Sequence, residues 1–279
     1  MKTITNATLE ELLRLLQEEE QSAATIEKYT RTLRGFAAWL GEAPLTKEAV
    51  TRWKAALVQR GYAPVTVNGM LSALNKLLRL LGRQDCRVRF LKVQRRLFVD
   101  AARELSREEY LRLVKTARGT GRERLALILE TICATGIRVS ELQYLTAETV
   151  CAGRAVIRLK GKIRTIMLPR KLCAKLNKYL KQQKIASGQI FLTRSGAPLS
   201  RNQIWAEMKA LCRKARVEPG KVFPHNLRHL FARSYYRICR DIVRLADVLG
   251  HSSVETTRIY LISTGKEHER QLERLGLVS

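Results

Sequence analysis

Apolar side chains recur at intervals of three and four residues through most of the first ninety positions. This spacing constrains the fold more than any other feature of the chain, because a period near 3.6 gathers apolar residues on one face of a helix. Glycines interrupt the pattern near Gly41, Gly61 and Gly82. The spacing therefore predicts four short helices that pack as a bundle over residues 1–90.

The starts of these helices are expected at residues that can cap a first turn. Threonine hydroxyls accept hydrogen bonds from the free amides of a helix start, and proline suits its first position. On these grounds we place the helix starts after Thr8, near Thr25, after Thr46 and after Pro64.

A second unit begins near Leu105. The run Ser106–Glu109 resembles a capping box, and Leu125–Cys133 is a short apolar helix that runs into Thr135-Gly136. A β-branched segment, Ala155–Leu159, a Lys-Gly-Lys turn and then Thr165–Leu168 predict a β-hairpin. Helical patterns resume to the end of the chain. The expected fold class is mainly α, with a small antiparallel β-sheet in the second unit.

Basic residues without helical periodicity fill residues 83–104. This stretch is either a solvated loop or a strap that lies along a phosphate backbone, where each neutralised phosphate releases counterions. We expect three parts in the chain: a helical domain over residues 1–90, a basic linker over residues 91–104, and a second domain over residues 105–279.

The net charge indicates a polyanionic partner. Fifty-two Lys and Arg against 25 Asp and Glu give a formal charge of +27. Such a field attracts polyanions, and nucleic acid is the usual one. Charge alone does not separate a DNA-processing enzyme from a ribosomal-type binder.

Cysteine and carboxylate patterns point away from metal sites. The six cysteines include no Cys-x-x-Cys pair, which favours reduced thiols over a zinc site or a disulfide framework. No Asp/Glu cluster has ligand spacing, so a two-metal nuclease or transposase would lack its ligands. With no signal peptide and no apolar run near the ~18–20 residues of a membrane span, we expect a cytoplasmic protein, and the missing ligand patterns lead us to expect no metal or cofactor.

Two basic side chains share the start of one predicted helix. Pro224 suits a first helical turn, and positions three apart lie on one face, so His225 and Arg228 project together. Taken alone, this pair also fits a solvated helix face. A further arginine, Arg138, follows the apolar helix in the run Ala134–Leu142.

A second histidine lies at a predicted corner of the chain. Gly250 ends one helix, and Ser252 with Glu255 is expected to form the capping box of the next. His251 then lies beside a helix N-terminus, where amides favour anions, or is simply a packed turn residue. Tyr260 follows nine residues later, at the end of that helix. A phenol, with a pKa of about 10, attacks phosphorus only when cations or a base assist it.

The hairpin turn carries two lysines, Lys160 and Lys162. A lysine on such a tip can reach into a groove and donate a proton to a leaving oxygen, although lysine is also common there for solubility. Lys160 is the expected general acid and Lys162 the alternative.

The order of these residues resembles the signature of the tyrosine recombinase (phage integrase) family, in particular the compact Xer-like integrases. The segments that carry the likeness are Ala134–Leu142, His225–Ala232 and Leu249–Tyr260. Helices expected at Thr25–Leu40 and Gly61–Leu81 are similar to the N-terminal core-binding (SAM-like) helices of that family, so the likeness covers nearly the whole chain. The resemblance implies that residues 1–90 are a DNA-binding domain and residues 105–279 a catalytic domain. It also implies a nucleoid-associated protein of a prokaryote or mobile element.

The resemblance implies a mechanism. Tyr260 would attack a DNA phosphate, giving a 3′-phosphotyrosyl bond and a free 5′-hydroxyl, without metal or ATP. Arg138 and Arg228 would bind the non-bridging oxygens, and Lys160 would protonate the leaving oxygen. His225 would support proton transfer at the tyrosine, and His251 would donate to the phosphate.

The resemblance also implies partners: double-stranded DNA, three further copies of the chain assembled on two DNA sites, and accessory DNA-bending or directionality proteins. Residues 264–279 are expected to form a tail helix that docks either on a neighbouring protomer or on its own domain. Two other functions remain open, a type IB topoisomerase-like relaxase and a catalytically idle DNA-binding regulator.

Overall fold

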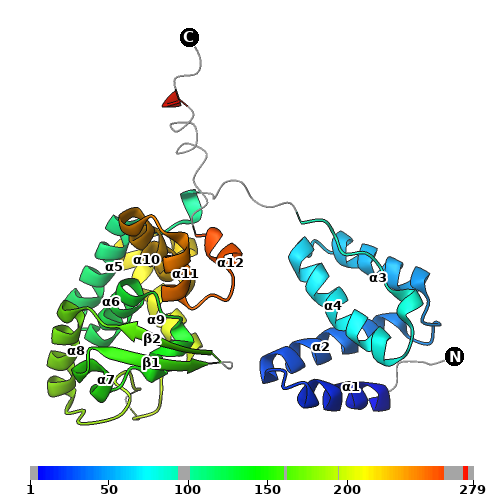
Figure 1. Ribbon diagram of the computed structural model, residues 1–279, viewed down its shortest axis with the longest axis horizontal. Coiled ribbons are helices and arrows are strands. Elements are labelled where there is room, and N and C mark those ends of the chain that lie inside the picture. The colour runs from blue at the N-terminus through cyan, green and yellow to red at the C-terminus, as the bar shows by residue number, and fades with distance from the viewer. Residues whose placement is uncertain (1–5, 94–100, 160–161, 194, 261–272, 276–279) are drawn as a thin grey trace. The chain divides into compact units, whose positions relative to one another are not determined.

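The computed structural model describes residues 6–93, 101–159, 162–193, 195–260 and 273–275. It divides into two compact units, Met1–Arg95 and Arg96–Ser279, and each has its own apolar core (Figure 1). Most of the described residues are helical, and the described strands form one two-stranded antiparallel sheet. The predicted fold class is confirmed.

The first unit is a bundle of four helices, as the apolar spacing predicts. They are α1 (Asn6–Glu18), α2 (Ala23–Leu40), α3 (Lys47–Gln59) and α4 (Pro64–Leu80). Helix α2 packs against the other three helices of this bundle. In its core the rings of Phe36 and Trp53 lie 4.8 Å apart, and both side chains are buried.

Two of the predicted helix starts are shifted by a few residues. Thr8 lies inside α1 and does not cap it, and Ser22, not Thr25, caps α2 by accepting from the amide of Thr25. An apolar stripe fixes the face of a helix but leaves its first turn undefined, because capping residues stand outside the stripe. The start after Thr46 is confirmed, since its hydroxyl accepts from Ala49 at 3.2 Å.

The beginning of the basic segment lies on the first unit. After the short 3₁₀ helix η1 (Gln84–Cys86), the side-chain amide of Asn68 donates to the Leu91 carbonyl at 2.9 Å and accepts from the Leu91 amide at 2.8 Å. Lys54 Nζ donates to the Arg89 carbonyl at 2.7 Å. Residues 94–100 lie outside the described residues, so the linker over residues 91–104 stays a prediction.

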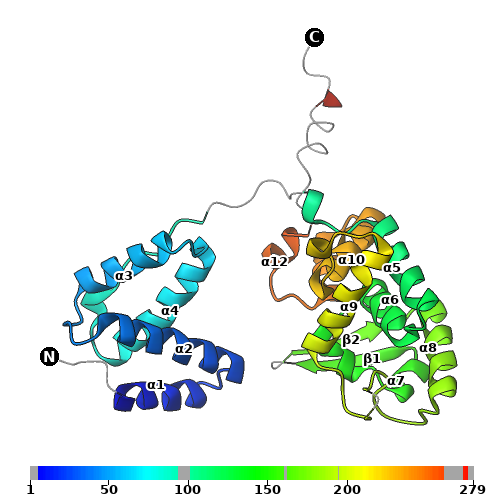
Figure 2. The ribbon, with the colours of Figure 1, turned by 180° about the vertical axis from the view of Figure 1, so that it is seen from behind.

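The second unit is built around α6 (Glu123–Thr135), which packs against four other helices of the unit and is buried along most of its length. The other helices are α5 (Arg107–Gly119), α7 (Ala147–Cys151), α8 (Arg170–Gln183), α9 (Arg201–Ala215), α10 (Pro224–Cys239), α11 (Ile242–Leu249), α12 (Val254–Arg258), and the 3₁₀ helices η2 (Ala101–Arg103), η3 (Val139–Tyr144) and η4 (Pro219–Lys221). Both views place α11 and α12 on the side of this unit opposite to α8 (Figure 2). The capping box at Ser106 and Glu109 is confirmed by bonds of 2.8 and 3.1 Å.

The predicted hairpin is confirmed as β1 (Arg154–Leu159) and β2 (Lys162–Met167), which pair from Arg154 with Met167 to Leu159 with Lys162. Lys162 is therefore the first residue of β2 and not part of the turn, because two residues suffice to connect antiparallel strands. Lys160 lies outside the described residues. Successive side chains of β1 alternate between the two faces of the sheet, because Ala155 and Ile157 are buried and Val156 is exposed.

All six cysteines are free thiols, and burial raises the pKa of Cys133. None of the described helices is long and apolar enough to cross a membrane. The tail helix expected at residues 264–279 falls almost entirely outside the described residues and stays a prediction.

Candidate functional site

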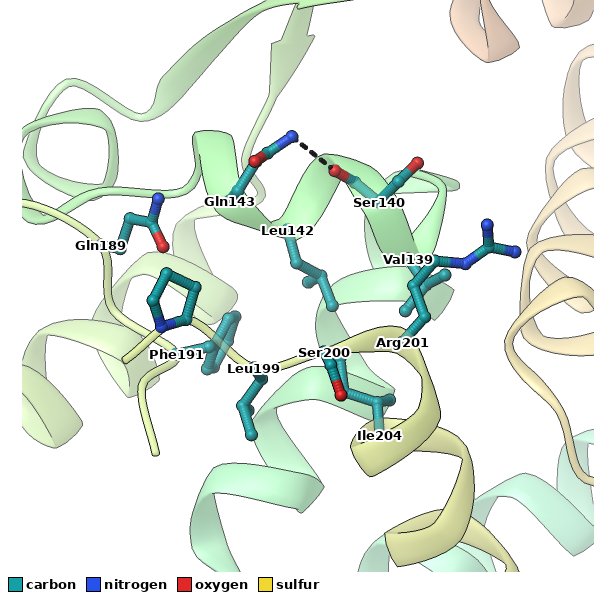
Figure 3. Close-up of a pocket in the computed structure, with 11 residues that line it drawn as sticks. Val139, Ser140, Leu142, Gln143, Gln189, Phe191, Leu199, Ser200, Arg201 and Ile204 are labelled. Atoms are coloured by element: carbon teal, nitrogen blue, oxygen red, sulfur yellow. Dashed lines mark hydrogen bonds between the residues drawn. The ribbon is translucent and has the colours of Figure 1, made fainter. Parts of the chain in front are cut away.

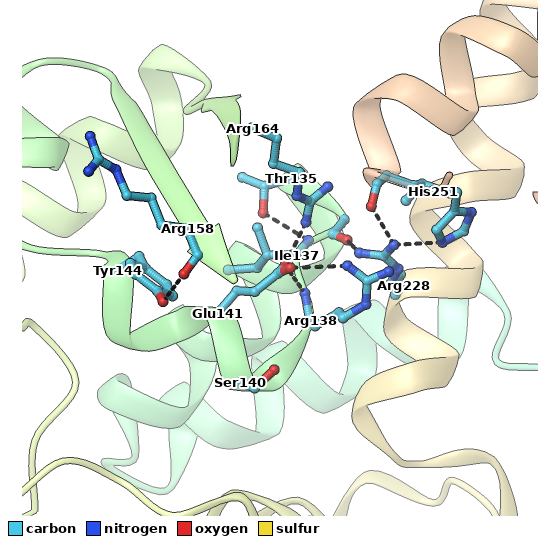
Figure 4. Close-up of polar contacts among 12 residues, drawn as sticks. Thr135, Ile137, Arg138, Ser140, Glu141, Tyr144, Arg158, Arg164, Arg228 and His251 are labelled. Carbon is cyan, nitrogen blue, oxygen red and sulfur yellow. Dashed lines mark hydrogen bonds and ion pairs between the residues drawn. The ribbon is translucent and has the colours of Figure 1, made fainter. Parts of the chain in front are cut away.

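Five of the six predicted residues come from four segments and lie together in the second unit. Arg138 precedes η3, His225 and Arg228 lie in the first turns of α10, His251 lies between α11 and α12, and Tyr260 follows α12. Figure 4 shows Arg138, Arg228 and His251 converging on one region. The sixth, Lys160, lies outside the described residues.

Arg228 is the buried centre of this group, with 2% of its surface exposed. Its Nη1 donates to the Gly136 carbonyl at 2.5 Å, and its Nη2 donates to the Leu249 carbonyl at 2.7 Å. Burial, and then the charge of Arg138, lowers the pKa of Arg228 to about 10, while contact with Tyr260 opposes the shift. The guanidinium therefore stays charged near neutral pH and ties the end of α6 to the end of α11.

Glycine is required at both of those helix ends. Gly136 and Gly250 have φ of 67° and 65°, in the left-handed region that side chains disfavour. A Cβ at Gly136 would lie 2.3 Å from Phe231 Cδ1, and one at Gly250 would lie 2.5 Å from Arg164 Cδ. The prediction that Gly250 ends a helix is confirmed.

The hydrogen bonds of His251 define its tautomer. Arg228 Nη2 lies 2.9 Å from His251 Nε2, and a guanidinium can only donate, so Nε2 accepts. The ring proton then lies on Nδ1, which is 2.8 Å from the Thr257 hydroxyl. Burial, followed by the charges of Arg228 and Arg138, lowers the pKa of His251 to about 4. His251 is thus neutral at pH 7.

The capping box expected at Ser252 and Glu255 is wrong by one residue. Ser253 caps α12, because its hydroxyl accepts from the Glu255 amide at 3.2 Å. Adjacent serines offer the same chemistry, so the sequence did not distinguish them. Glu255 is then the second residue of α12, one position too early to complete a capping box.

Tyr260 is buried, with 3% of its surface exposed, and packs on Ala232, Leu245 and Leu249. Its ring stacks on His251, with centroids 5.6 Å apart and planes 13° from parallel. The centroid of the His225 ring lies 5.8 Å from that of Tyr260. Two imidazole rings therefore lie close to the ring of Tyr260.

A third imidazole in this group, His229, was missed by the sequence prediction. Its ring meets that of Tyr260 edge-on at 4.3 Å and that of His225 at 4.7 Å. Burial, followed by His225 and Arg228, lowers its pKa to about 4, and the pKa of His225 is also lowered, by burial and then by Arg228. The signal was available, because residues four apart share a helix face.

Glu141 and Arg164 were also missed. The Glu141 carboxylate is 1% exposed and accepts from the Arg138 amide at 2.7 Å, Arg138 Nη1 at 3.1 Å and Arg164 Nη2 at 2.5 Å. Burial lowers the pKa of Arg164, an effect that its attraction to Glu141 opposes. The Glu141 contact had a signal, a glutamate three residues after Arg138, whereas nothing in the sequence singled out Arg164.

The chemistry of this group is that of an anion site beside a phenol. The Arg228 guanidinium and three imidazole rings lie close to Tyr260, and the nearby carboxylate of Glu141 is paired with two arginines. Within the described part of the chain, no group of three or more His, Cys, Asp or Glu side chains could hold a metal ion.

A separate cavity of about 250 Å³ lies between η3 and α9 (Figure 3). Its apolar wall includes Leu142, Phe191 and Ile204, and Gln143 and Arg201 lie at its edge. None of the five predicted site residues that the structure describes lines it.

Comparison with family models identifies both units. Residues 103–267 match the model described as "Phage integrase family", and residues 9–85 match "Phage integrase, N-terminal SAM-like domain". The chain is 31% identical to tyrosine recombinase XerA of Pyrococcus furiosus, over 99% of this chain and 96% of that protein. It is 30% identical to tyrosine recombinase XerD of Xanthomonas axonopodis pv. citri, over 93% of each.

Solved structures share the fold at lower identity. The XerH recombinase bound to its difH substrate superposes with a TM-score of 0.72 at 20% identity, covering 99% of this chain and 85% of that one. A lambda integrase from a tetramer bound to a Holliday junction gives 0.74 at 19% identity, covering 93% and 78%.

Proposed function

The chain belongs to the phage integrase family, and we propose that it catalyses site-specific recombination by cleaving and rejoining duplex DNA through a 3′-phosphotyrosyl intermediate. One observation carries the proposal for the residues: the ring of Tyr260 lies close to three imidazole rings, and its phenol contacts the buried Arg228. This arrangement supports the assignment of a nucleophile, proton acceptors and a cation for phosphate to these residues.

Tyr260 is the proposed nucleophile. Its oxygen attacks the scissile phosphorus, the bond from phosphorus to the 5′-oxygen breaks, and the phenolic proton passes to a neighbouring base. His225, whose lowered pKa keeps it neutral near pH 7, is the proposed acceptor of this proton. The packing of Tyr260 on its own unit supports cleavage by the tyrosine of the same protomer.

Arg138 and Arg228 are the proposed ligands of the non-bridging oxygens. Forty per cent of the Arg138 side chain is exposed, which leaves its guanidinium open to an anion. Arg228 is buried and adds its positive charge to the site. Planar guanidiniums suit phosphate because they donate two parallel hydrogen bonds. A phosphate between Arg228 and His251 would favour protonation of His251, which would then donate to it.

Lys160 is the proposed general acid, because a lysine in the turn between two strands can reach into a groove and donate a proton to a leaving oxygen. It would protonate the leaving 5′-oxygen, a contribution of about 10²–10⁴ in rate. Lys162 is the less favoured candidate, since it begins β2.

We propose that the reaction needs neither metal nor ATP. Arginines can supply the charge that a metal would supply at phosphorus, and the phosphotyrosyl ester conserves the bond energy needed to rejoin the strands. Rejoining reverses the first step, as a 5′-hydroxyl attacks the ester and releases Tyr260.

Double-stranded DNA and further copies of the chain are the proposed partners. The relatives of known structure include XerH bound to difH and a lambda integrase tetramer on a Holliday junction. By analogy, residues 1–90 and 105–279 would bind the same site, residues 91–104 would connect them, and residues 264–279 would contact a neighbouring protomer. Accessory proteins would set direction.

Strand exchange tests the function. A preferred duplex is first selected from a random-sequence library by binding, and two such duplexes of different length are then incubated with the protein. We expect recombinant duplexes and a four-way junction intermediate. Relaxation of supercoiled DNA without any exchange would favour a type IB topoisomerase-like relaxase, and binding without cleavage would favour a regulator.

A further inference from the structure

A partly buried arginine outside the six assigned residues connects three segments of the site (Figure 4). Arg164 lies on β2 opposite Ile157, and 13% of its side chain is exposed. Its Nη2 lies 2.5 Å from the Glu141 carboxylate, and its Nη1 donates to the Val248 carbonyl at 2.6 Å. The hairpin is thereby joined to the Arg138 segment and to the end of α11.

One nitrogen of the Arg164 guanidinium, Nη2, affects the charge that Arg138 presents to an anion. Glu141 Oε2 accepts from both Arg164 and the Arg138 amide, and its Oε1 lies 3.1 Å from Arg138 Nη1. Two guanidiniums therefore share one buried carboxylate, and the three side chains together carry one positive charge. Without Arg164, the carboxylate would cancel most of the charge that Arg138 offers to an anion.

The other terminal nitrogen of Arg164, Nη1, affects the position of His251. Val248 is followed by Leu249, whose carbonyl accepts from Arg228, and then by Gly250 and His251. The Arg164 stem lies so close to Gly250 that a Cβ there would come within 2.5 Å of Arg164 Cδ. The turn that carries His251 is thus held against the same side chain that contacts Glu141.

We propose that Arg164 is a positioning residue for the phosphate-binding groups: it holds the Arg138 segment and the His251 turn in one arrangement and offsets the charge of Glu141. This role rests on the proposed function, in which Arg138 and His251 act on the scissile phosphate. Arg164 itself touches neither the nucleophile nor, being largely buried, the surface of a duplex.

The experiment compares Arg164→Met, which keeps an unbranched stem without charge, with Arg154→Met as a matched control. Arg154 is an exposed arginine at the start of β1. Single-turnover formation of the DNA adduct is measured on three nicked duplexes. The first has the ordinary scissile phosphodiester, the second replaces one non-bridging oxygen by a methyl group, and the third has sulfur as the 5′-bridging atom.

On the phosphodiester we expect Arg164→Met to slow adduct formation about 10²-fold, as loss of one transition-state donor does. On one methylphosphonate isomer the loss should shrink to under about threefold, because a neutral phosphoryl group builds less charge for cations to offset. The loss should persist on the sulfur-bridged duplex, since a thiolate leaves without protonation and that substrate reports only on the general acid. Arg154→Met should match the wild type on all three.

Equal losses on the phosphodiester and both methylphosphonates would show that Arg164 acts only through folding. A loss that disappears on the sulfur-bridged duplex would assign it to leaving-group protonation. Either result overturns the proposal. Absence of adduct with the wild-type protein would instead contradict the proposed function, and this role with it.

A second variant, Arg164→Lys, distinguishes the proposed role from a folding defect, because it keeps a cation opposite Glu141 but lacks the planar guanidinium. We expect it to lose about tenfold on the phosphodiester, with the same recovery on the methylphosphonate. Affinity for the uncleaved duplex should stay within about threefold of the wild type in both variants, because the lost stabilisation belongs to the transition state. A parallel loss of affinity would contradict the proposal.

Discussion

The guanidinium of Arg228 donates to Nε2 of His251 across 2.9 Å, and this contact fixes His251 as a neutral imidazole with its proton on Nδ1. The same guanidinium holds the carbonyls of Gly136 and Leu249, so the ends of two helices depend on one buried charge. The protonation state of His251 is thereby coupled to whatever anion Arg228 attracts.

Acid should destabilise the protein through two histidines. The folded-state pKa values of His229 and His251 are about 4, below the ordinary value of 6.5, so the unfolded chain binds more protons between these limits. Their contribution to stability is complete above about pH 6.5 and is lost as the pH falls towards 4, with a slope of at most about 1.4 kcal/mol per pH unit for each histidine. Urea unfolding at pH 7, 6 and 5 measures this loss. The double variant His229→Gln/His251→Gln should show a shallower slope, and an unchanged slope would contradict the assignment.

Removal of the Glu141 charge should destabilise the second unit. Glu141→Gln leaves two arginines without their shared buried carboxylate, and we expect a cost of about 3 kcal/mol in the free energy of unfolding. Glu123→Gln is the matched control, because Glu123 is 43% exposed in its pair with Arg118 and should cost under about 1 kcal/mol. Denaturant unfolding compares the two. Similar costs would show that Glu141 is not the centre of the network.

Gly250 should tolerate alanine less well than another glycine with a positive φ. Gly250 and Gly188 have φ of 65° and 77°, but only at Gly250 does an added Cβ meet another atom within 4 Å. Alanine at either position costs about 1–2 kcal/mol for the left-handed backbone, and at Gly250 the contact with Arg164 should add about 1–3 kcal/mol. Thermal unfolding of Gly250→Ala and Gly188→Ala separates these effects. Equal decreases in the melting temperature would mean that the Arg164 side chain moves away from the added Cβ without an energetic cost.

Arg138 should be required for cleavage more than for binding. Arg138→Ala is expected to slow single-turnover cleavage about 10²–10³-fold, the cost of losing a transition-state donor. Arg138→Lys should recover little of this, because an ammonium does not reproduce the planar fork. Cleavage that falls less than about threefold in either variant would remove Arg138 from the proposed phosphate site.

Much of the fold followed from local patterns. The four helices of the first unit, the capping box at Ser106, the hairpin and the end of α11 at Gly250 all depend on residues close together in sequence, where periodicity and turn chemistry act. Errors fell at helix starts, as with Ser22 and Ser253, because neighbouring hydroxyl residues compete for the same cap.

The site was only partly predictable. The residues proposed from the sequence form an ordered set that resembles a family signature, and the geometry among five of them needed the structure. The sequence carried a local signal for His229 but none for Arg164. His229 shares a helix face with His225, a local relation, whereas Arg164 reaches Val248, 84 positions away, and no local pattern encodes that contact.

The most direct measurement of the central claim is a covalent trap. The protein is incubated in EDTA, without ATP, with a nicked duplex from the selected site, so that the short cleaved fragment diffuses away and religation fails. The account predicts a protein–DNA adduct on a denaturing gel, its phosphate mapped by mass spectrometry to Tyr260, and no adduct from Tyr260→Phe. An adduct that persists in Tyr260→Phe, or that forms only when magnesium is added, would contradict it.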